Sequence, residues 1–381
     1  MDPDEPMSTP SENSIAGSDA GDAAASPGRV RQRFEQWSAN PRCEANVLSA
    51  VSNVRMDQVA EQRGLPPSMG QSPFAIAAGN TFEFTIFRER AKRLREQLVR
   101  EGLLQEGDDG FEDFRTRDKG GPMANPDAAE TSTMAFLRQI GAGGRGKFAS
   151  RIVAGATITV PDAAMLPRTR LGLDVLLVIP STTPGKDEPR LPWRLVVGEV
   201  KSFVDRGGYT DRPKLAAARA QAGVYVAGLR AVMAALGITA ERVVVETKGF
   251  LVFVRPGGRY PVVYPNEDFA AQAIRAEDGF AKMREIARRK PKLGDEGVDA
   301  VLAAGRTFIP SCTSFCDLAH LCQKEAFEAG RPSVLGDDMA RFVGPVDLHR
   351  AYAILEGDAP RNADEKDLAR RIAALEALRD R

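Results

Sequence analysis

Strand-like segments stand on both sides of one long alanine-rich segment in the middle of this chain. The alanine-rich segment covers residues 212–237, and its composition predicts a helix. Apolar, β-branched runs flank it at 147–160, 171–180, 193–203, 242–248 and 249–265. Strands on both sides of a helix predict a mixed α/β core. The turn-rich residues 181–192 predict that the second and third runs pair as a hairpin.

Helical regions surround this core. The clearest pattern is at residues 80–102, which place apolar side chains on one face and basic side chains on the other. The apolar face comprises Phe84, Phe87, Ala91, Leu94 and Val99. Residues 105–130 are polar and rich in Gly and Pro, which predicts a loop or insertion. We expect a disordered acidic tail at 1–29, an N-terminal helical region at 30–130, the core at 131–266, a helical region at 267–335 and a C-terminal helical segment at 336–381.

Charge is balanced overall, with 52 basic and 52 acidic side chains among 381 residues. Residues 1–28 contain six acids and no base, which leaves 52 basic against 46 acidic side chains elsewhere, a formal charge of +6. A polyanion would therefore meet local basic patches rather than a global field. The sequence shows neither a secretory leader nor an apolar run of about 18 residues, so we expect a cytoplasmic chain with no membrane partner.

Acidic and basic residues interrupt the two strands of the predicted hairpin. Asp174 lies within one apolar run, and Glu199 and Lys201 end the next, two residues apart and therefore on one face. Taken singly, each has an ordinary interpretation as a capped carboxylate or an edge-strand ion pair. Pairing of the strands would bring the two carboxylates together, and they repel each other unless a cation lies between them. Oxygen ligands of this kind suit magnesium or manganese, beside which Lys201 would hold a phosphate oxygen or an attacking water.

The alanine-rich helix adds two polar residues on one face. Gln221 and Tyr225 are four residues apart. An ordinary amphipathic helix with Tyr225 in the core explains this pair equally well. Together with Asp174 and Glu199-Val200-Lys201, however, the pair resembles the active-site motifs of the PD-(D/E)xK nuclease superfamily. The RecB-like branch, which includes the Cas4 and AddB types, is the most similar.

This resemblance implies a fold and a set of roles. The fold is a restriction-endonuclease-like mixed central sheet flanked by helices. Asp174, Glu199 and the carbonyl group of Val200 would bind Mg²⁺ or Mn²⁺. Glu83, four residues after Gly79, matches the position of a further upstream ligand in this branch. Lys201 would orient the attacking water, and Gln221 and Tyr225 would position the nucleic-acid backbone.

The four cysteines are distributed unevenly, one near the start and three near the end. Cys43 stands 269 residues before the group Cys312, Cys316 and Cys322. In a reducing compartment, clustered cysteines indicate metal rather than disulfides. The residues alone leave zinc and an iron–sulfur cluster open. The resemblance implies a structural 4Fe–4S cluster that joins the N- and C-terminal helical regions, although the three-residue gap after Cys312 departs from the commoner two and keeps zinc as the alternative.

Several basic residues are candidates for contacts with nucleic-acid phosphates, although each also suits an ordinary solvated surface. They are Arg88, Lys92, Arg95, Arg145, Lys147, Arg289 and Lys290. The resemblance implies a metal-dependent nuclease acting on DNA, and we expect single-stranded or frayed ends. Repair, CRISPR-type processing and antiphage defence are the settings that it implies. Because no nucleotide-binding GxxxxGK[ST] motif is present, unwinding would need a helicase or a defence-system partner. Two alternatives are a catalytically inactive DNA-binding or assembly subunit and a zinc-stabilised scaffold.

Overall fold

The structure is a computed structural model, and it describes most of the chain from residue 37 onward. The described residues are 37–38, 40–52, 54–65, 73–115, 126–142, 150–161, 170–181, 192–205, 210–256, 260–289, 297–309, 312–313 and 315–379. The acidic tail that we expect at 1–29 lies outside these residues.

Within the described residues, seven strands form one mixed sheet in the order β1-β2-β3-β4-β6-β7, and β5 pairs with β4 beside this path. The strands are β1 (Gly110–Asp113), β2 (Arg151–Thr159), β3 (Arg170–Pro180), β4 (Trp193–Val204), β5 (Val243–Val245), β6 (Lys248–Val254) and β7 (Pro261–Asp268). β1 runs parallel to β2, and β4 runs parallel to both β5 and β6, whereas the other neighbours are antiparallel. The expected mixed α/β core is confirmed.

The hairpin predicted from the turn-rich stretch is also confirmed. β3 and β4 pair antiparallel from Val175 opposite Gly198 to Pro180 opposite Trp193. The two strands are the centre of the sheet, with β2 on one side and β6 on the other. Their apolar side chains are almost all buried, as expected for strands covered on both faces.

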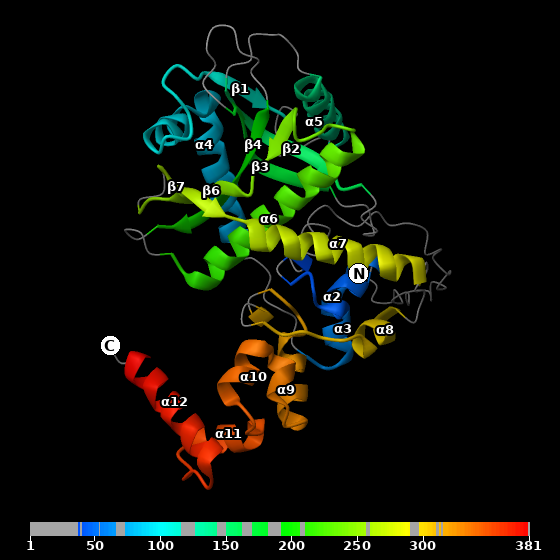
Figure 1. Cartoon of the computed structure of the whole chain (residues 1–381), viewed down its shortest axis with the longest axis vertical. Helices are drawn as coiled ribbons and strands as arrows, with labels where there is room; N and C mark the ends of the chain where they lie inside the picture. The colour runs from blue at the N-terminus through cyan, green and yellow to red at the C-terminus, as the bar shows by residue number, and fades with distance from the viewer. Residues whose placement is uncertain are drawn as a thin grey trace, which may run out of the picture.

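Helices cover the two faces of this sheet. The helices α6 (Arg212–Ala235) and α7 (Ala270–Arg289) share one apolar cluster with Leu195 and Val197 of β4. On the opposite face, α4 (Pro73–Arg100) packs Phe82 and Ile86 against Val196 and Val200. The alternation of β4 side chains between the two clusters is the two-residue period of a strand. Figure 1 shows α6 (green) running across the sheet, with α7 (yellow) packed against it.

The start of the described chain packs against segments that follow the sheet. The helices α2 (Glu44–Ser52) and α3 (Met56–Gln62) lie beside α7 and α8 (Gly297–Ala303), as Figure 1 shows. The Trp37 ring stacks on Phe280 of α7 with 5.0 Å between ring centroids. The backbone N–H of Ala45 donates to the carbonyl of Gly305 at 3.2 Å. The N-terminal helices therefore dock on the C-terminal side of the core through ordinary packing.

The last part of the chain forms a separate helical segment. It contains α9 (Ala319–Glu328), the 3₁₀ helix η2 (Pro332–Leu335), α10 (Asp337–Val343), α11 (Leu348–Leu355) and α12 (Ala363–Arg379). These helices have their own small apolar cluster, which includes Val343, Ile354 and Leu368. The Arg350 guanidinium ties α11 to α12 through Glu365 at 2.9 Å. Figure 1 shows this segment extending away from the sheet.

Two expectations about local structure are wrong. The polar stretch 105–130 contains the edge strand β1 and the start of α5 (Pro126–Gly141), because Phe111 contributes a partly buried side chain and β2 offers an open edge. The helix at 80–102 is interrupted, since Glu89, Arg90 and Ala91 have left-handed φ values of 52°, 58° and 59°.

This interruption changes which side chains of α4 face the sheet. A helical period that continues across the break predicts Phe84 on the apolar face. Phe84 is exposed, and Phe82 and Ile86 are buried in its stead. Leu94, beyond the break, is buried as expected.

Among the described helices, none has a stretch long and apolar enough to cross a bilayer.

Candidate active site and cysteine cluster

The first candidate site lies where β3 and β4 meet beside α6. The register of the hairpin places Asp174 opposite Glu199, one position beyond the Val175–Gly198 pair. An Asp174 carboxylate oxygen accepts a hydrogen bond from the backbone N–H of Val200 at 2.9 Å. The two carboxylates predicted to converge are therefore on neighbouring positions of adjacent strands.

Lys201 pairs with the buried carboxylate of Glu199. The Lys201 Nζ lies 2.6 Å from Glu199 Oε1, and the side-chain exposure is 18% for the lysine and 0% for the glutamate. A carboxylate without solvent needs a cation close by, because burial of an isolated charge is costly. In this structure the ammonium group is that cation.

A hydrogen-bonded chain continues from Lys201 into α6. The amide Oε1 of Gln221 accepts from Lys201 Nζ at 2.7 Å, and its Nε2 donates to the Tyr225 hydroxyl at 2.5 Å. Both α6 side chains are buried. This geometry favours a role in holding Lys201 over the contact with a nucleic-acid backbone that we expect from the resemblance. The four-residue spacing that puts Gln221 and Tyr225 on one helical face is what makes the chain continuous.

The backbone around these residues is irregular. The register of β4 against β6 shifts between Val200 and Val204, the stretch that contains Lys201. Bulges beside functional sites redirect side chains. In β2, Gly155 occupies the position opposite Asp174 and has φ of 66°, and a side chain there would collide with Arg115. Only glycine adopts this conformation readily and leaves the necessary space.

Glu83 belongs to the helix on the other face of the sheet. It is half-buried on α4, whereas Gln221 and Tyr225 approach from α6. One turn earlier, a Cβ placed on Gly79 would lie 3.9 Å from Ser202 Oγ. This turn of α4 therefore lies against the segment of β4 that follows Lys201.

The predicted basic contacts divide into three groups. Arg88 and Lys92 are exposed on α4, and Arg289 is exposed on α7 beside Glu285. Arg95 is engaged by backbone carbonyls instead, including those of Arg90 at 3.1 Å and Gly110 at 3.4 Å. Its side chain anchors the turn before β1. The remaining three, Arg145, Lys147 and Lys290, lie outside the described residues.

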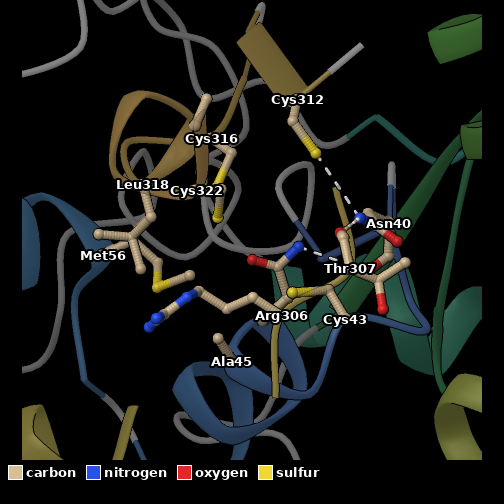
Figure 2. A pocket seen from close by; sticks show the side chains of 12 residues that line it. Asn40, Cys43, Ala45, Met56, Arg306, Thr307, Cys312, Cys316, Leu318 and Cys322 are labelled. Carbon is tan, nitrogen blue, oxygen red and sulfur yellow. Dashed lines mark hydrogen bonds between the residues drawn. The ribbon is translucent and has the colours of Figure 1, made fainter. Parts of the chain in front are cut away.

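The second candidate site contains all four cysteines. Cys43, Cys312, Cys316 and Cys322 line one cavity with a volume of about 10 Å³, although Cys43 is 269 residues from the next of them. Figure 2 shows Cys312, Cys316 and Cys322 on one side of this cavity and Cys43 with Asn40 and Arg306 on the other. The long-range juxtaposition expected from the sequence is therefore present.

The thiols of this cluster are strongly desolvated. Burial raises the pKa of the Cys312 and Cys316 thiols and raises the pKa of Cys322 to about 12, although the nearby Arg306 acts in the opposite direction on Cys322. The charge of a nearby Cys43 thiolate also raises the pKa of each of these three thiols. Four cysteines that share one buried space form a donor set of the type that binds zinc or iron–sulfur clusters.

The residues around the cavity have the chemistry of a metal centre, but their side chains are not arranged as one. Within the part of the chain that the structure describes, no three His, Cys, Asp or Glu side chains have the geometry of a metal site. The cavity has room for about one water molecule.

Two residues of the cysteine cavity were missed by the motif-based analysis. Asn40 donates from Nδ2 to the carbonyl of Thr307 at 2.7 Å and to Cys312 Sγ at 3.6 Å. Arg306 lines the same cavity and donates from Nη1 to the carbonyl of Leu302 at 2.6 Å. The only signal in the sequence is proximity, since Asn40 is three residues before Cys43 and Arg306 is six before Cys312.

The chain was also compared with known proteins. Searches against models of protein families, curated proteins and solved structures found no match.

Proposed function

We propose that this chain is a metal-dependent nuclease of the PD-(D/E)xK type, with a restriction-endonuclease-like core and a four-cysteine metal centre. The observation that supports it best is the cluster of Asp174, Glu199, Lys201 and Gln221 at the β3–β4 hairpin. Neighbouring carboxylates beside a lysine held by an amide are suited to hydrolysis of a phosphodiester.

The carboxylates supply the oxygen ligands that Mg²⁺ or Mn²⁺ prefers. Asp174 and Glu199 would be the principal ligands, with the Val200 carbonyl and Glu83 from α4 as further candidates. When bound, such an ion lowers the pKa of a coordinated water and offsets the charge that builds on the phosphate.

Lys201 has a distinct role in this proposal. Its ammonium group neutralises Glu199 in the structure and would supply the positive charge that stabilises the phosphate or orients the attacking water. Gln221 and Tyr225 restrict where that ammonium group can go, because they fix one of its hydrogen bonds. Orientation of this kind raises the rate without a change in chemistry.

The substrate is proposed to be DNA, with single-stranded or frayed ends preferred. Arg88 and Lys92 are exposed on α4, where their charges are candidates for contacts with phosphates. The four cysteines are proposed to hold a 4Fe–4S cluster, with zinc as the alternative, and to fasten α9 to the segment before α2.

The test uses protein purified without oxygen and end-labelled single- and double-stranded DNA, with Mn²⁺ or with EDTA. The variant Asp174→Asn keeps an acceptor for the Val200 N–H but loses the charge that would bind the ion. Asp268→Asn is the matched control, because Asp268 also accepts one backbone N–H at 2.9 Å but lies on the edge strand β7, two strands away from β4.

We expect cleavage that requires Mn²⁺, is lost in Asp174→Asn and is retained in Asp268→Asn. If folded wild-type protein binds DNA but does not cut it under any metal condition, the proposal is refuted in favour of the DNA-binding subunit. Equal loss in both variants would assign the effect to folding and would also count against an active site at Asp174.

A further inference from the structure

We propose that Asn40 and Arg306 form the outer shell of the four-cysteine centre and hold its metal in place. This inference rests on the metal-centre part of the proposed function and is independent of the nuclease activity. Neither residue is a ligand by chemistry, since an arginine has no free electron pair to offer and Asn40 presents its amide N–H to sulfur.

Asn40 is placed to act on the sulfur of Cys312 and to hold the segment before α2 against the segment before α9. It is buried, and its Nδ2 group donates to Cys312 Sγ at 3.6 Å and to the Thr307 carbonyl at 2.7 Å. The backbone carbonyl of Asn40 accepts a hydrogen bond from the Cys43 N–H at 3.2 Å. One side chain and its backbone therefore connect the first cysteine to the second.

Cys312 receives a second donor of the same kind. The backbone N–H of Ile309 lies 3.4 Å from its Sγ. Two N–H groups directed at one sulfur stabilise a thiolate, since hydrogen bonds to an ionised acceptor are stronger than those to a neutral one. Hydrogen bonds to ligating sulfurs also set the potential of iron–sulfur centres.

Arg306 supplies the charge that four thiolates require. Its guanidinium lines the cysteine cavity, where Figure 2 shows it extending between Cys43 and Met56. Two contacts hold the guanidinium in place: it donates a hydrogen bond to the Leu302 carbonyl at 2.6 Å and forms an ion pair with Glu325 of α9. A buried set of negative ligands needs such a cation, because several like charges without solvent repel.

The experiment measures retention of metal, not cleavage. Wild-type protein and variants are purified without oxygen, iron, sulfide and zinc are quantified per chain, and the rate of metal loss to a chelator is followed. We expect Arg306→Met to lose metal about 10–100-fold faster, Arg306→Lys to lie between, and Asn40→Asp to lose metal faster than wild type. If the metal is an iron–sulfur cluster, its midpoint potential falls in Arg306→Met, because a nearby positive charge is removed.

Two controls separate this role from a structural one. Arg42→Met removes an arginine adjacent to Cys43 that points instead to Asp278 at 2.8 Å, and we expect no change in metal loss. Glu325→Gln removes the ion pair of Arg306 but keeps its charge at the cavity. If Glu325→Gln loses metal as fast as Arg306→Met, or if Arg306→Met retains it as wild type does, the proposal is overturned.

The result also separates the two parts of the proposed function. Wild-type protein without bound metal at the cysteines would refute this inference and the metal centre together. It would leave the nuclease proposal to be decided by Asp174→Asn alone.

Discussion

Replacement of Lys201 by alanine should destabilise the protein as well as stop catalysis. The Glu199 carboxylate is fully buried, and the Lys201 Nζ at 2.6 Å neutralises it. Removal of one partner from a buried ion pair leaves the other charge uncompensated, at a cost of about 3–5 kcal/mol. We take the lower end, about 3 kcal/mol, because the lysine retains 18% exposure and water can follow it into the space.

The same reasoning predicts a rescue by metal. A divalent cation at Glu199 would replace the lost ammonium, and a ligand at a hundredfold excess over its Kd stabilises the folded state by about 2.7 kcal/mol. The assay is urea-induced unfolding of wild type and Lys201→Ala, each in EDTA and in Mn²⁺. We expect the two proteins to differ by about 3 kcal/mol in EDTA and much less in Mn²⁺.

The double variant Glu199→Gln/Lys201→Ala provides the control. The pair Glu199–Lys201 is absent from it, so its stability in EDTA should exceed that of Lys201→Ala, and Mn²⁺ should stabilise it less than it stabilises Lys201→Ala because only Asp174 of the two principal ligands remains. If Lys201→Ala unfolds in EDTA at the same urea concentration as wild type, the argument from the buried pair is wrong.

Three further predictions follow from other contacts. Tyr225→Phe should reduce the cleavage rate and change its pH profile, whereas stability should fall little, because the variant removes only the hydroxyl that accepts a hydrogen bond from the Gln221 amide. An unchanged pH profile would count against the hydrogen-bonded chain. Arg95→Ala should lower thermal stability but not DNA affinity, and the exposed Lys92→Ala should do the reverse in a salt-dependent binding assay. The hydrogen bond from Arg350 lowers the pKa of Glu365 below its ordinary value of 4.5. The ionised glutamate therefore stabilises the fold fully above pH 4.5, and this stabilisation is lost as the pH falls through the lower pKa of the folded state. Glu365→Gln should remove this acid sensitivity of helices α11 and α12, as measured by circular dichroism.

Much of the core follows from patterns that are local in the sequence. The hairpin of β3 and β4 was predictable because two apolar runs flank a turn-rich stretch, and the convergence of Asp174 with Glu199 follows from that pairing alone. The long helix α6 was predictable from its composition, and its four-residue spacing placed Gln221 beside Tyr225.

Features that depend on tertiary context were not predictable in this way. The edge strand β1 has only four residues, and its sequence GFED resembles a loop until β2 supplies a partner. The left-handed residues at 89–91 leave no mark in the composition of α4, so the helical phase on one side could not be extended to the other. Likewise, that Gln221 turns to Lys201 rather than outward depends on how closely α6 packs on β4.

The packing around Cys43 bears on what a metal centre could contribute. The N-terminal segment is already attached to the C-terminal side by Trp37 on Phe280, by Ala45 on Gly305 and by Asn40 on Thr307. These contacts join the two segments independently of the cysteines, so a metal bound by the four cysteines would reinforce the interface rather than be its sole attachment. Loss of metal in Cys316→Ser should then release α9 and the segment before it first, while the sheet and its α6–α4 layers stay folded. Hydrogen exchange distinguishes this from global unfolding, because the exchange protection of β4 and β6 amides would survive in the first case and disappear in the second.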